Sequence, residues 1–188
     1  GGHGSVTGIQ LRGLPKRYST IYIDGVKMSD PSTSDNAFYF SNIMSNSIDR
    51  VEILRGSQSS LYGSSAIGGT VNIFTKKGKK GKNREIDISS GSNGTKNINL
   101  SYSGANEKHN YFIGLNRFLT DGISAMNDEP TTNDNDSYKN DGIVANYGYK
   151  IFQNLNFETG LRFSDSFLNY DRVKVGQTDA NDSTDDTE

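Results

Sequence analysis

The sequence predicts a mostly β protein in which a mixed α+β region is followed by an antiparallel meander of strands. The first observation is composition: 21 of the 188 residues are glycine, and Asn, Ser and Asp are also abundant. These residues favour turns and caps over helix interiors, which excludes a helical bundle. The second observation is that short apolar runs recur, and that apolar and polar residues alternate in the second half of the chain. No apolar run approaches about 18 residues, so no membrane-spanning helix is predicted.

The chain is expected to divide near residue 80, where charge and composition change. Residues 1–84 carry 12 Lys and Arg against 5 Asp and Glu, a net charge of +7, whereas residues 85–188 carry 8 against 17, a net charge of −9. The stretch KKGKKGKNR at 76–84 has six basic residues, two glycines and no apolar residue. We interpret it as a solvated linker. A patch for lipid headgroups or nucleic acid is the alternative, although no interleaved aromatic residues support nucleic acid.

Before this boundary, the pattern predicts four short strands and two helical turns. One helical turn is expected at Gln58–Tyr62, with Ser57 as its N-cap and Gly63 as its C-cap. A short helix or turn is also expected near Phe40–Ser45. Clusters of Gly, Pro, Asp and Ser separate the strands, and an Asp-Gly turn closes the second of them. The predicted strands are Ile9–Arg12, Thr20–Val26, Arg50–Leu54 and Gly69–Thr75.

After the boundary, five runs alternate apolar and polar residues over about the 9–11 residues that a tilted strand needs to cross a bilayer. Their connections are short at 105–109 and 152–153 but long and polar at 119–137, which is typical of outer-membrane barrels. A soluble β-sandwich also alternates and is the competing interpretation. The predicted strands are Arg84–Gly91, Lys96–Gly104, Asn110–Phe118, Tyr138–Ile151 and Asn154–Phe167.

One face of these runs is predicted to contact lipid. It is apolar and ends in Tyr and Phe, whereas the opposite face carries Asn, Ser, Lys and Arg that suit a wet lumen. Because five strands cannot close a barrel, whose minimum is about eight, the chain is expected to be a fragment of a larger barrel. The residues predicted to point to lipid are Ile98, Leu100, Tyr102, Ile143, Tyr147, Tyr149, Phe157, Leu161 and Phe163.

A family resemblance rests on two segments, LRGLPKRYSTIYIDGVKM at Leu11–Met28 and IDRVEILRGSQSSLYGSSAIGGTVNIFTKKG at Ile48–Gly78. Together they resemble the plug domain of TonB-dependent outer-membrane receptors. Four hallmarks of that domain occur in order, at Arg12-Gly13, Ile23–Val26, Arg50–Gly56 and Leu61–Ile73. The resemblance implies that residues 1–80 are the C-terminal part of an α+β plug domain. Residues 81–188 would then be the start of a transmembrane β-barrel, with about five strands.

Four later segments look most like the cobalamin (vitamin B12) branch of these receptors. They are GSNGTKNINLSYSG at Gly91–Gly104, LTDGIS at Leu119–Ser124, NDND at Asn133–Asp136 and FSDSFLNYD at Phe163–Asp171. The resemblance implies energy-coupled uptake of a scarce nutrient, cobalamin first and a ferric siderophore as the alternative in the same class. A soluble β-rich binding or adhesion module is the alternative from another class.

The same resemblance implies the protein's surroundings and partners. We expect a bacterial outer-membrane protein in contact with lipid, a monomer that binds a small molecule and no nucleic acid. TonB, with its proton-driven inner-membrane complex, would engage an N-terminal segment that lies outside this chain. We also expect the signal peptide, the early plug and most of a barrel of about 22 strands to lie outside it.

The resemblance places substrate contacts on the outward apices of the plug. In this chain, those are the loops around 6–8, 14–16 and 32–35. The residues implied to contact cobalamin are Val6, Gly8, Pro15, Thr33 and Ser34.

The acidic loops are the candidate metal site. Calcium prefers six to eight oxygen ligands, which two neighbouring loops could supply. Cobalamin receptors use calcium-ordered loops of this kind, and the implied ligands here are Asp134, Asp136, Tyr170, Asp171 and Asp182. Ser124 stands where a further carboxylate would be offered. The alternative is a solvated acidic loop without metal.

Catalysis has no support in the sequence, so no catalytic residues are assigned and no enzyme is predicted. YGSSAIGG lacks the G-x-S-x-G spacing, and the basic stretch lacks the rest of a P-loop. The absence of cysteine removes disulfides, thiolate zinc sites and cysteine nucleophiles. With only His3 and His109, a centre of several histidines is also disfavoured.

Overall fold

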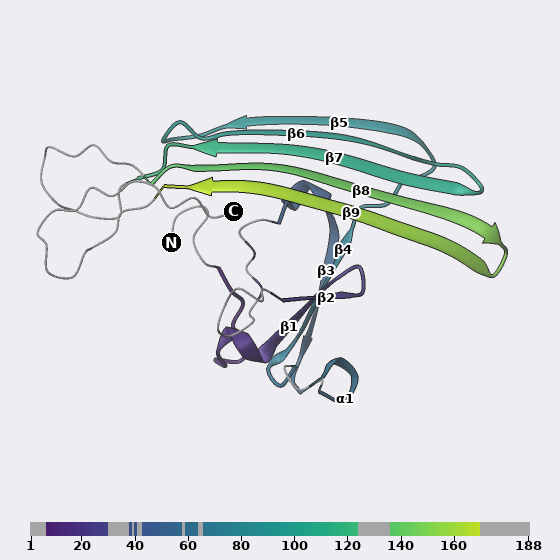
Figure 1. The fold of residues 1–188 in the computed structure, drawn as a ribbon, viewed down its shortest axis with the longest axis horizontal. Coiled ribbons are helices and arrows are strands. Elements are labelled where there is room, and N and C mark those ends of the chain that lie inside the picture. Colours follow the sequence, from purple (N-terminus) through teal and green to yellow (C-terminus); the bar gives the residue numbers. More distant parts are fainter. Residues whose placement is uncertain are drawn as a thin grey trace, which may run out of the picture. The chain divides into compact units, whose positions relative to one another are not determined.

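The computed structural model describes residues 7–29, 38, 40, 43–57, 59–63, 66–123 and 136–169. They form two compact units, which are divided between Lys77 and Gly78, and each unit holds one β-sheet (Figure 1). The prediction of a mostly β chain, with an α+β part followed by a strand meander, is confirmed. Among the described residues, no helix is both long enough and apolar enough to cross a membrane.

The first unit is a four-stranded sheet in the order β2-β1-β4-β3. β1 and β4 are parallel, whereas β2 pairs with β1 and β3 pairs with β4 in antiparallel fashion. The elements are the strands β1 (Ser19–Ile23), β2 (Val26–Met28), β3 (Ile48–Arg55) and β4 (Gly69–Thr75), the 3-10 turns η1 (Lys16–Tyr18) and η3 (Ser45–Ser47), and the helix α1 (Ser59–Tyr62).

The core of this unit lies on one face of β1 and β4, because alternate residues of a strand share a face. Ile21 pairs with Val71 and Ile23 with Ile73, and each of the four side chains is at most 3% exposed. Partly buried apolar side chains pack against this cluster: Ile9, Leu11, Met28, Phe38, Phe40, Ile43 and Ile48.

The strand predicted at Ile9–Arg12 is wrong. Residues 7–10 are irregular, and a turn follows in which the Leu14 N–H donates to the Leu11 carbonyl at 3.1 Å. Arg12 and Gly13 have φ angles of 57° and 74°, which belong to the left-handed region and cannot continue a strand. The apolar side chains of Ile9 and Leu11 pack on the core from this irregular segment instead.

The other predicted elements of the first unit are present with small shifts. The helical turn is α1, and Gly63 follows it with φ 87°, as a glycine after a helix end does. The Tyr62 ring packs edge-on against the Tyr22 ring of β1, with centroids 5.2 Å apart. The turn expected near Phe40–Ser45 is present, because the Ile43 N–H donates to the Phe40 carbonyl at 3.1 Å, and η3 follows from Ser45.

The Asp-Gly turn between β1 and β2 also holds the end of β4. Asp24 and Gly25 have φ angles of 49° and 83°, the paired left-handed conformations of a tight hairpin turn. The Asp24 carboxylate accepts hydrogen bonds from the Thr75 N–H at 2.8 Å and the Thr75 hydroxyl at 2.5 Å. The Asp24 N–H donates to the Ile73 carbonyl at 2.9 Å. Thr75 is the last residue of β4, so this turn fixes the chain just before it leaves the unit.

Replacing Asp24 by alanine is therefore expected to destabilise the first unit by about 2 kcal/mol, because a hydrogen-bonded charged acceptor is lost. Asp24→Asn is the matched control, since asparagine also tolerates a left-handed turn and keeps one acceptor oxygen. Amide hydrogen exchange of β4 in the full-length protein measures the effect. Equal protection in both variants and in the parent would contradict this role of Asp24.

The second unit is a five-stranded antiparallel meander in which each strand pairs with its neighbours in sequence (Figure 1). All five predicted runs form strands, with ends shifted by at most three residues. The two-residue turn after β8 comes with a register shift between Lys150 and Phe152. The strands are β5 (Gly81–Ser90), β6 (Lys96–Ala105), β7 (His109–Thr120), β8 (Tyr138–Phe152) and β9 (Leu155–Leu168).

The register places apolar side chains in rows across one face, because directly paired residues of antiparallel strands share a face. One row crosses all five strands, and its members are 40–71% exposed: Ile86, Leu100, Leu115, Ile143 and Phe163. We call this the outward face. All nine residues predicted to point to lipid belong to it, and seven of them are exposed; Tyr102 and Tyr149 are partly buried. The prediction that these nine residues share one face of the meander is confirmed, and their contact with lipid stays a prediction.

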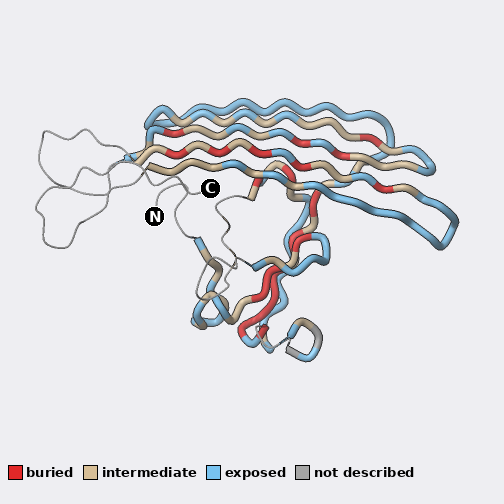
Figure 2. The backbone as a smooth tube through the Cα atoms, viewed as in Figure 1, coloured by how far each residue is buried: buried red, intermediate tan, exposed pale blue. Residues whose placement is uncertain are grey.

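The opposite face is polar and more buried. Figure 2 shows buried and exposed positions alternating along β7 and β8. Phe112 and Val144 are 2% and 1% exposed on this face. The Asn116 side-chain amide donates to the side-chain oxygens of Asn97 at 2.9 Å and Asn99 at 2.6 Å. This row of amides is the polar face that the sequence predicted for a lumen.

Candidate functional site

The first candidate site is the segment 7–16 of the first unit, where substrate contacts were predicted. The Thr7 carbonyl accepts a hydrogen bond from the Phe40 N–H at 3.0 Å, and the Pro15 carbonyl accepts one from the Tyr18 N–H at 3.0 Å. The Lys16 side chain lies against Gly8, because a Cβ added at Gly8 would stand 2.9 Å from Lys16 Cδ. The structure thus brings Gly8 beside the residue that follows Pro15.

Two of the five predicted substrate residues, Gly8 and Pro15, can be placed, and they lie close together through Lys16. Gly8 is partly buried and Pro15 is exposed. The other three, Val6, Thr33 and Ser34, lie outside the described residues. Lys16 lies within the predicted apex loop 14–16, although it was not among the residues predicted to contact cobalamin.

Gly68 and Gly69 allow β4 to begin close to β3 and to the turn at Leu11. The Gly68 N–H donates to the Tyr18 carbonyl at 2.9 Å. Gly69 has φ 145°, and a Cβ there would lie 2.5 Å from the Leu54 carbonyl oxygen and 2.8 Å from Leu11 Cδ1. β4 can therefore begin this close to β3 and to the turn at Leu11 only because residue 69 has no side chain.

The second candidate site is the base of the long loop between β7 and β8, where metal ligands were predicted. The Asp121 N–H donates to the Asn93 carbonyl at 2.9 Å, and the Gly122 N–H donates to the Thr120 hydroxyl at 3.2 Å. Gly122 packs directly against the backbone of Asp136, with no room for a Cβ. The two ends of this loop therefore lie side by side, next to the short loop that contains Asn93.

The end of β9 joins the same base. The Asn169 N–H donates to the Ser137 carbonyl at 2.9 Å, and the Asn169 side-chain amide donates to the Ser137 hydroxyl at 2.8 Å. Asn169 directly precedes Tyr170, and Ser137 directly follows Asp136. Ser137 and Asn169, the described residues next to predicted calcium ligands, therefore lie side by side at this end of the sheet.

Only one predicted calcium ligand, Asp136, can be placed; it is partly buried and has a polar partner of its own. Asp134, Tyr170, Asp171 and Asp182 lie outside the described residues. Within the described ranges, no three His, Cys, Asp or Glu side chains lie close enough to hold a metal ion together.

The opposite end of the five-stranded sheet carries an aromatic cluster on the outward face. The Tyr111 hydroxyl donates to the Tyr102 hydroxyl at 3.3 Å, and His109 Nδ1 lies 2.7 Å from the Tyr147 hydroxyl. The His109 and Tyr149 rings are 4.8 Å apart. Tyr and Phe were predicted at the ends of the apolar face, but the place of His109 among them was not.

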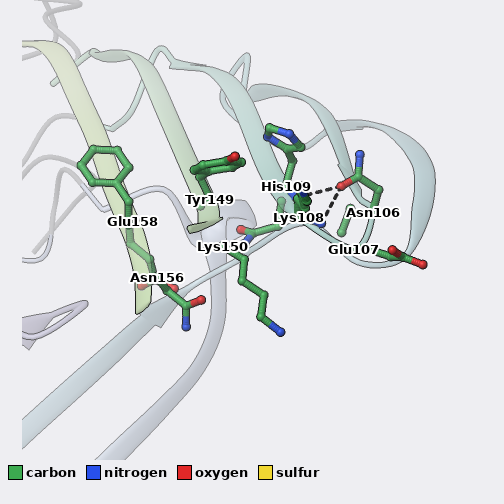
Figure 3. A pocket seen from close by; sticks show the side chains of 12 residues that line it. Asn106, Glu107, Lys108, His109, Tyr149, Lys150, Asn156 and Glu158 are labelled. Carbon is green, nitrogen blue, oxygen red and sulfur yellow. Dashed lines mark hydrogen bonds between the residues drawn. The ribbon is translucent and has the colours of Figure 1, made fainter. Parts of the chain in front are cut away.

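A pocket of about 290 Å3 lies at this same end, lined by the turn at 105–109 and the ends of β8 and β9. Figure 3 shows the His109 and Tyr149 rings on one side of the strands, and the Lys150 and Asn156 side chains on the other. The Asn106 side-chain oxygen accepts hydrogen bonds from the N–H groups of Lys108 at 2.9 Å and His109 at 2.8 Å (Figure 3). The pocket offers charged groups of both signs at the rim of the sheet.

Comparison with known proteins gives a family match for the first unit and relatives for most of the chain. Residues 1–70 match the TonB-dependent receptor plug domain. The chain is 34% identical to a vitamin B12 transporter, BtuB, of Photobacterium profundum over 152 residues, which is 80% of this chain and 25% of that protein. It is 26% identical to BtuB of Vibrio vulnificus over 91% of this chain and 28% of that protein. It spans about a quarter of the length of these relatives.

The fold resembles that of solved receptors. The siderophore receptor PirA of Acinetobacter baumannii matches with a TM-score of 0.66 at 19% identity, over 85% of this chain and 25% of that one. The pyoverdine receptor FpvA of Pseudomonas aeruginosa matches with a TM-score of 0.61 at 19% identity, over 78% of this chain and 20% of that one. At these identities, the likeness concerns the fold alone.

Proposed function

We propose that this protein is a receptor for energy-coupled nutrient uptake. Two findings support the proposal: residues 1–70 match the TonB-dependent receptor plug domain, and the strands after them fold like those of solved receptors. The protein resides in the bacterial outer membrane, with the outward face of β5–β9 against lipid. The observation that carries this proposal is the combination of a plug-family segment with a continuous apolar row across five strands. Neither feature alone has this meaning, since sheets of soluble proteins also alternate.

The proposed mechanism involves binding and movement without covalent chemistry. Extracellular loops and the segment around Gly8 and Pro15 bind the ligand, together with Val6, Thr33 and Ser34. TonB, driven by the proton gradient of the inner membrane, then acts on the N-terminal part of the plug and opens a path. The protein acts as a monomer.

Cobalamin is the ligand that we propose. The support is sequence similarity that runs through both units: the relative that is 34% identical over 80% of this chain is a vitamin B12 transporter. Solved siderophore receptors share the fold at lower identity. A ferric siderophore is therefore the alternative that the binding experiment must separate from cobalamin.

We further propose that calcium orders the acidic loops through Asp134, Asp136, Tyr170, Asp171 and Asp182. Carboxylates at one rim repel each other, and a hard cation with oxygen ligands removes this repulsion. The hydrogen bonds between Ser137 and Asn169 support the idea, because they bring the two loop bases together. Loops already ordered by calcium cost the ligand less entropy on binding.

A titration with cobalamin in calcium and in chelator is expected to show about tenfold tighter binding in calcium, within the usual range of coupling between sites. By linkage, cobalamin should tighten calcium binding by the same factor. The full-length protein is compared with Asp134→Ala/Asp136→Ala, which should lose the dependence on calcium. Asp128→Ala/Glu129→Ala removes the same charge from the same loop, and this control should keep the dependence.

Equal cobalamin affinity in calcium and in chelator would contradict the proposed calcium site and would mean that these residues form a solvated acidic loop. Binding of a ferric chelate, without binding of cobalamin, would contradict the proposed ligand but not the proposed receptor class. If neither is bound by a folded protein in its membrane, the proposed function is wrong.

A further inference from the structure

Basic residues gather at the turn end of the five-stranded sheet, opposite the long loop. Lys82 pairs with Gly104 near the 105–109 turn, and the Lys150 N–H donates to the Lys108 carbonyl at 2.8 Å. All the basic residues of this end are exposed. We call this set the basic rim: Lys79, Lys80, Lys82, Arg84, Lys108 and Lys150.

Two members of the basic rim lie on the outward face. Arg84 pairs directly with Tyr102, and Lys82 with Gly104, so both share the face of the aromatic cluster. The Arg84 guanidinium carbon lies 5.9 Å from the centre of the Tyr102 ring. Gly104 pairs with Tyr111, which pairs with Tyr147, so the row continues across the sheet from Lys82 into tyrosines.

The charge of the basic rim is largely uncompensated. Within the described part of the chain, none of its six members forms an ion pair. Glu107 and Glu158 are the acidic residues that line the pocket at this end. Two cations of the loop end differ in this respect: Arg117 and Lys139 both form ion pairs with Asp141, at 3.3 and 3.0 Å.

Toward the turn end of the outward face, the apolar row around Leu100 is followed by rows in which basic residues and tyrosines lie side by side. Arg84 lies in the row of Tyr102, and Lys82 lies in the row of Tyr111 and Tyr147. Tyrosine rings favour the level of lipid headgroups, and long basic side chains reach past them to the phosphates. Basic clusters beside a membrane attract anionic lipids at close range.

We propose that the basic rim is a binding site for anionic phospholipid headgroups in the leaflet at the turn end of the barrel. Lys82 and Arg84 hold the phosphate, and the Tyr102 and Tyr111 hydroxyls lie beside the glycerol region. This inference rests on the proposed place of the protein in the outer membrane. It goes beyond that function because it predicts that one end of the sheet binds anionic lipids more tightly than neutral lipids.

Lipid suits the site better than nucleic acid. The tyrosines lead directly into an exposed apolar row, which acyl chains would cover and a polynucleotide would leave in water. The Tyr102 and Tyr111 rings also pack against each other, with their centroids 5.4 Å apart.

The test uses the full-length protein in neutral detergent, titrated with short-chain phosphatidylglycerol and with short-chain phosphatidylcholine. We expect preferential binding of phosphatidylglycerol, and about 25-fold weaker binding of it to Lys82→Gln/Arg84→Gln, since each of the two basic groups near a membrane surface contributes roughly a fivefold effect. Lys96→Gln/Arg117→Gln is the matched control, because it removes one lysine and one arginine from the same face at the loop end. That variant should bind phosphatidylglycerol like the parent.

A second measurement needs no variant: raising NaCl from about 0.1 to 1 M shortens the screening length from about 10 to 3 Å and should abolish the preference of the parent protein. Equal binding of the two lipids, or equal loss in both double variants, overturns the proposal. Displacement of phosphatidylglycerol by inorganic phosphate at similar concentration would mean a free-phosphate site and also overturns it. Cobalamin titration of the same samples separates the two ideas, because cobalamin binding should be unchanged in Lys82→Gln/Arg84→Gln.

Discussion

Replacing Leu100 by arginine is expected to destabilise the barrel in a bilayer by about 1–3 kcal/mol, because a cation on the lipid side costs about 2–4 kcal/mol at the midplane and less toward either interface. Leu100 belongs to the apolar row that crosses all five strands and is 40% exposed. The basic rim lies at one end of the strands, and the ion pairs of Arg117 and Lys139 lie at the other. From Arg117 to His109 along β7 there are eight residue steps, roughly 26 Å of strand. Leu100 pairs with Leu115, two steps from Arg117 and six from His109, so it lies inside this band on the side of the long loop.

Ser101→Arg is the matched control, because Ser101 is the next residue on the same strand and points to the opposite face. It is partly buried there and pairs with Glu85 and Gly114. The full-length protein is refolded into vesicles and unfolded with denaturant. We expect Leu100→Arg to lower the free energy of unfolding more than Ser101→Arg does. The reverse order would mean that the outward face does not contact lipid.

Gly69→Ala is expected to destabilise the first unit by about 3 kcal/mol, through backbone strain and crowding together. At φ 145°, a side chain is strained, and the added Cβ would approach the Leu54 carbonyl oxygen and the Leu11 side chain. Neither can withdraw freely, because Leu54 lies within β3 and Leu11 packs on the core. Amide exchange of β1 and β4 in the full-length protein should report this loss.

Gly63→Ala separates the two causes. Gly63 also has a positive φ of 87°, but nothing lies within 4 Å of an added Cβ. Its replacement should cost only the conformational part, about 1 kcal/mol. If both variants lose the same protection, the close approach of β3 and β4 at Gly69 has no energetic importance.

Most strands were predictable from local patterns. β4 begins and ends where the sequence predicted, because a glycine pair and an alternating apolar run define it within a few residues. The hairpin at Asp24-Gly25 was predictable for the same reason, since an Asp-Gly pair favours the turn by itself. The failure at Ile9–Arg12 has a non-local cause: the apolar residues there pack on a sheet to which they do not belong.

The candidate site was predictable only in part. Gly8, Pro15 and the loop 14–16 came from the resemblance to plug domains, and the structure adds the contact of Lys16, at the start of η1, with Gly8. The basic stretch 76–84 was visible in the sequence. The sequence did not show that this stretch lies at the same end of the sheet as Lys108 and Lys150, because those residues are more than 20 positions away along the chain.

By itself, the sequence determined the fold class and the positions of the strands in the second unit, because alternation with period two is a local property. It did not determine which face of β7 points outward. Tyr111, Ile113 and Leu115 lie on one face of this strand and Phe112 lies on the other, so each face has apolar side chains that could be buried. Pairing decided it: Ile113 lies opposite Tyr102 and Ala145, so it joins the outward face, while Phe112 is buried on the other. A shift of one residue would reverse every side chain, and only contacts with neighbouring strands fix that register.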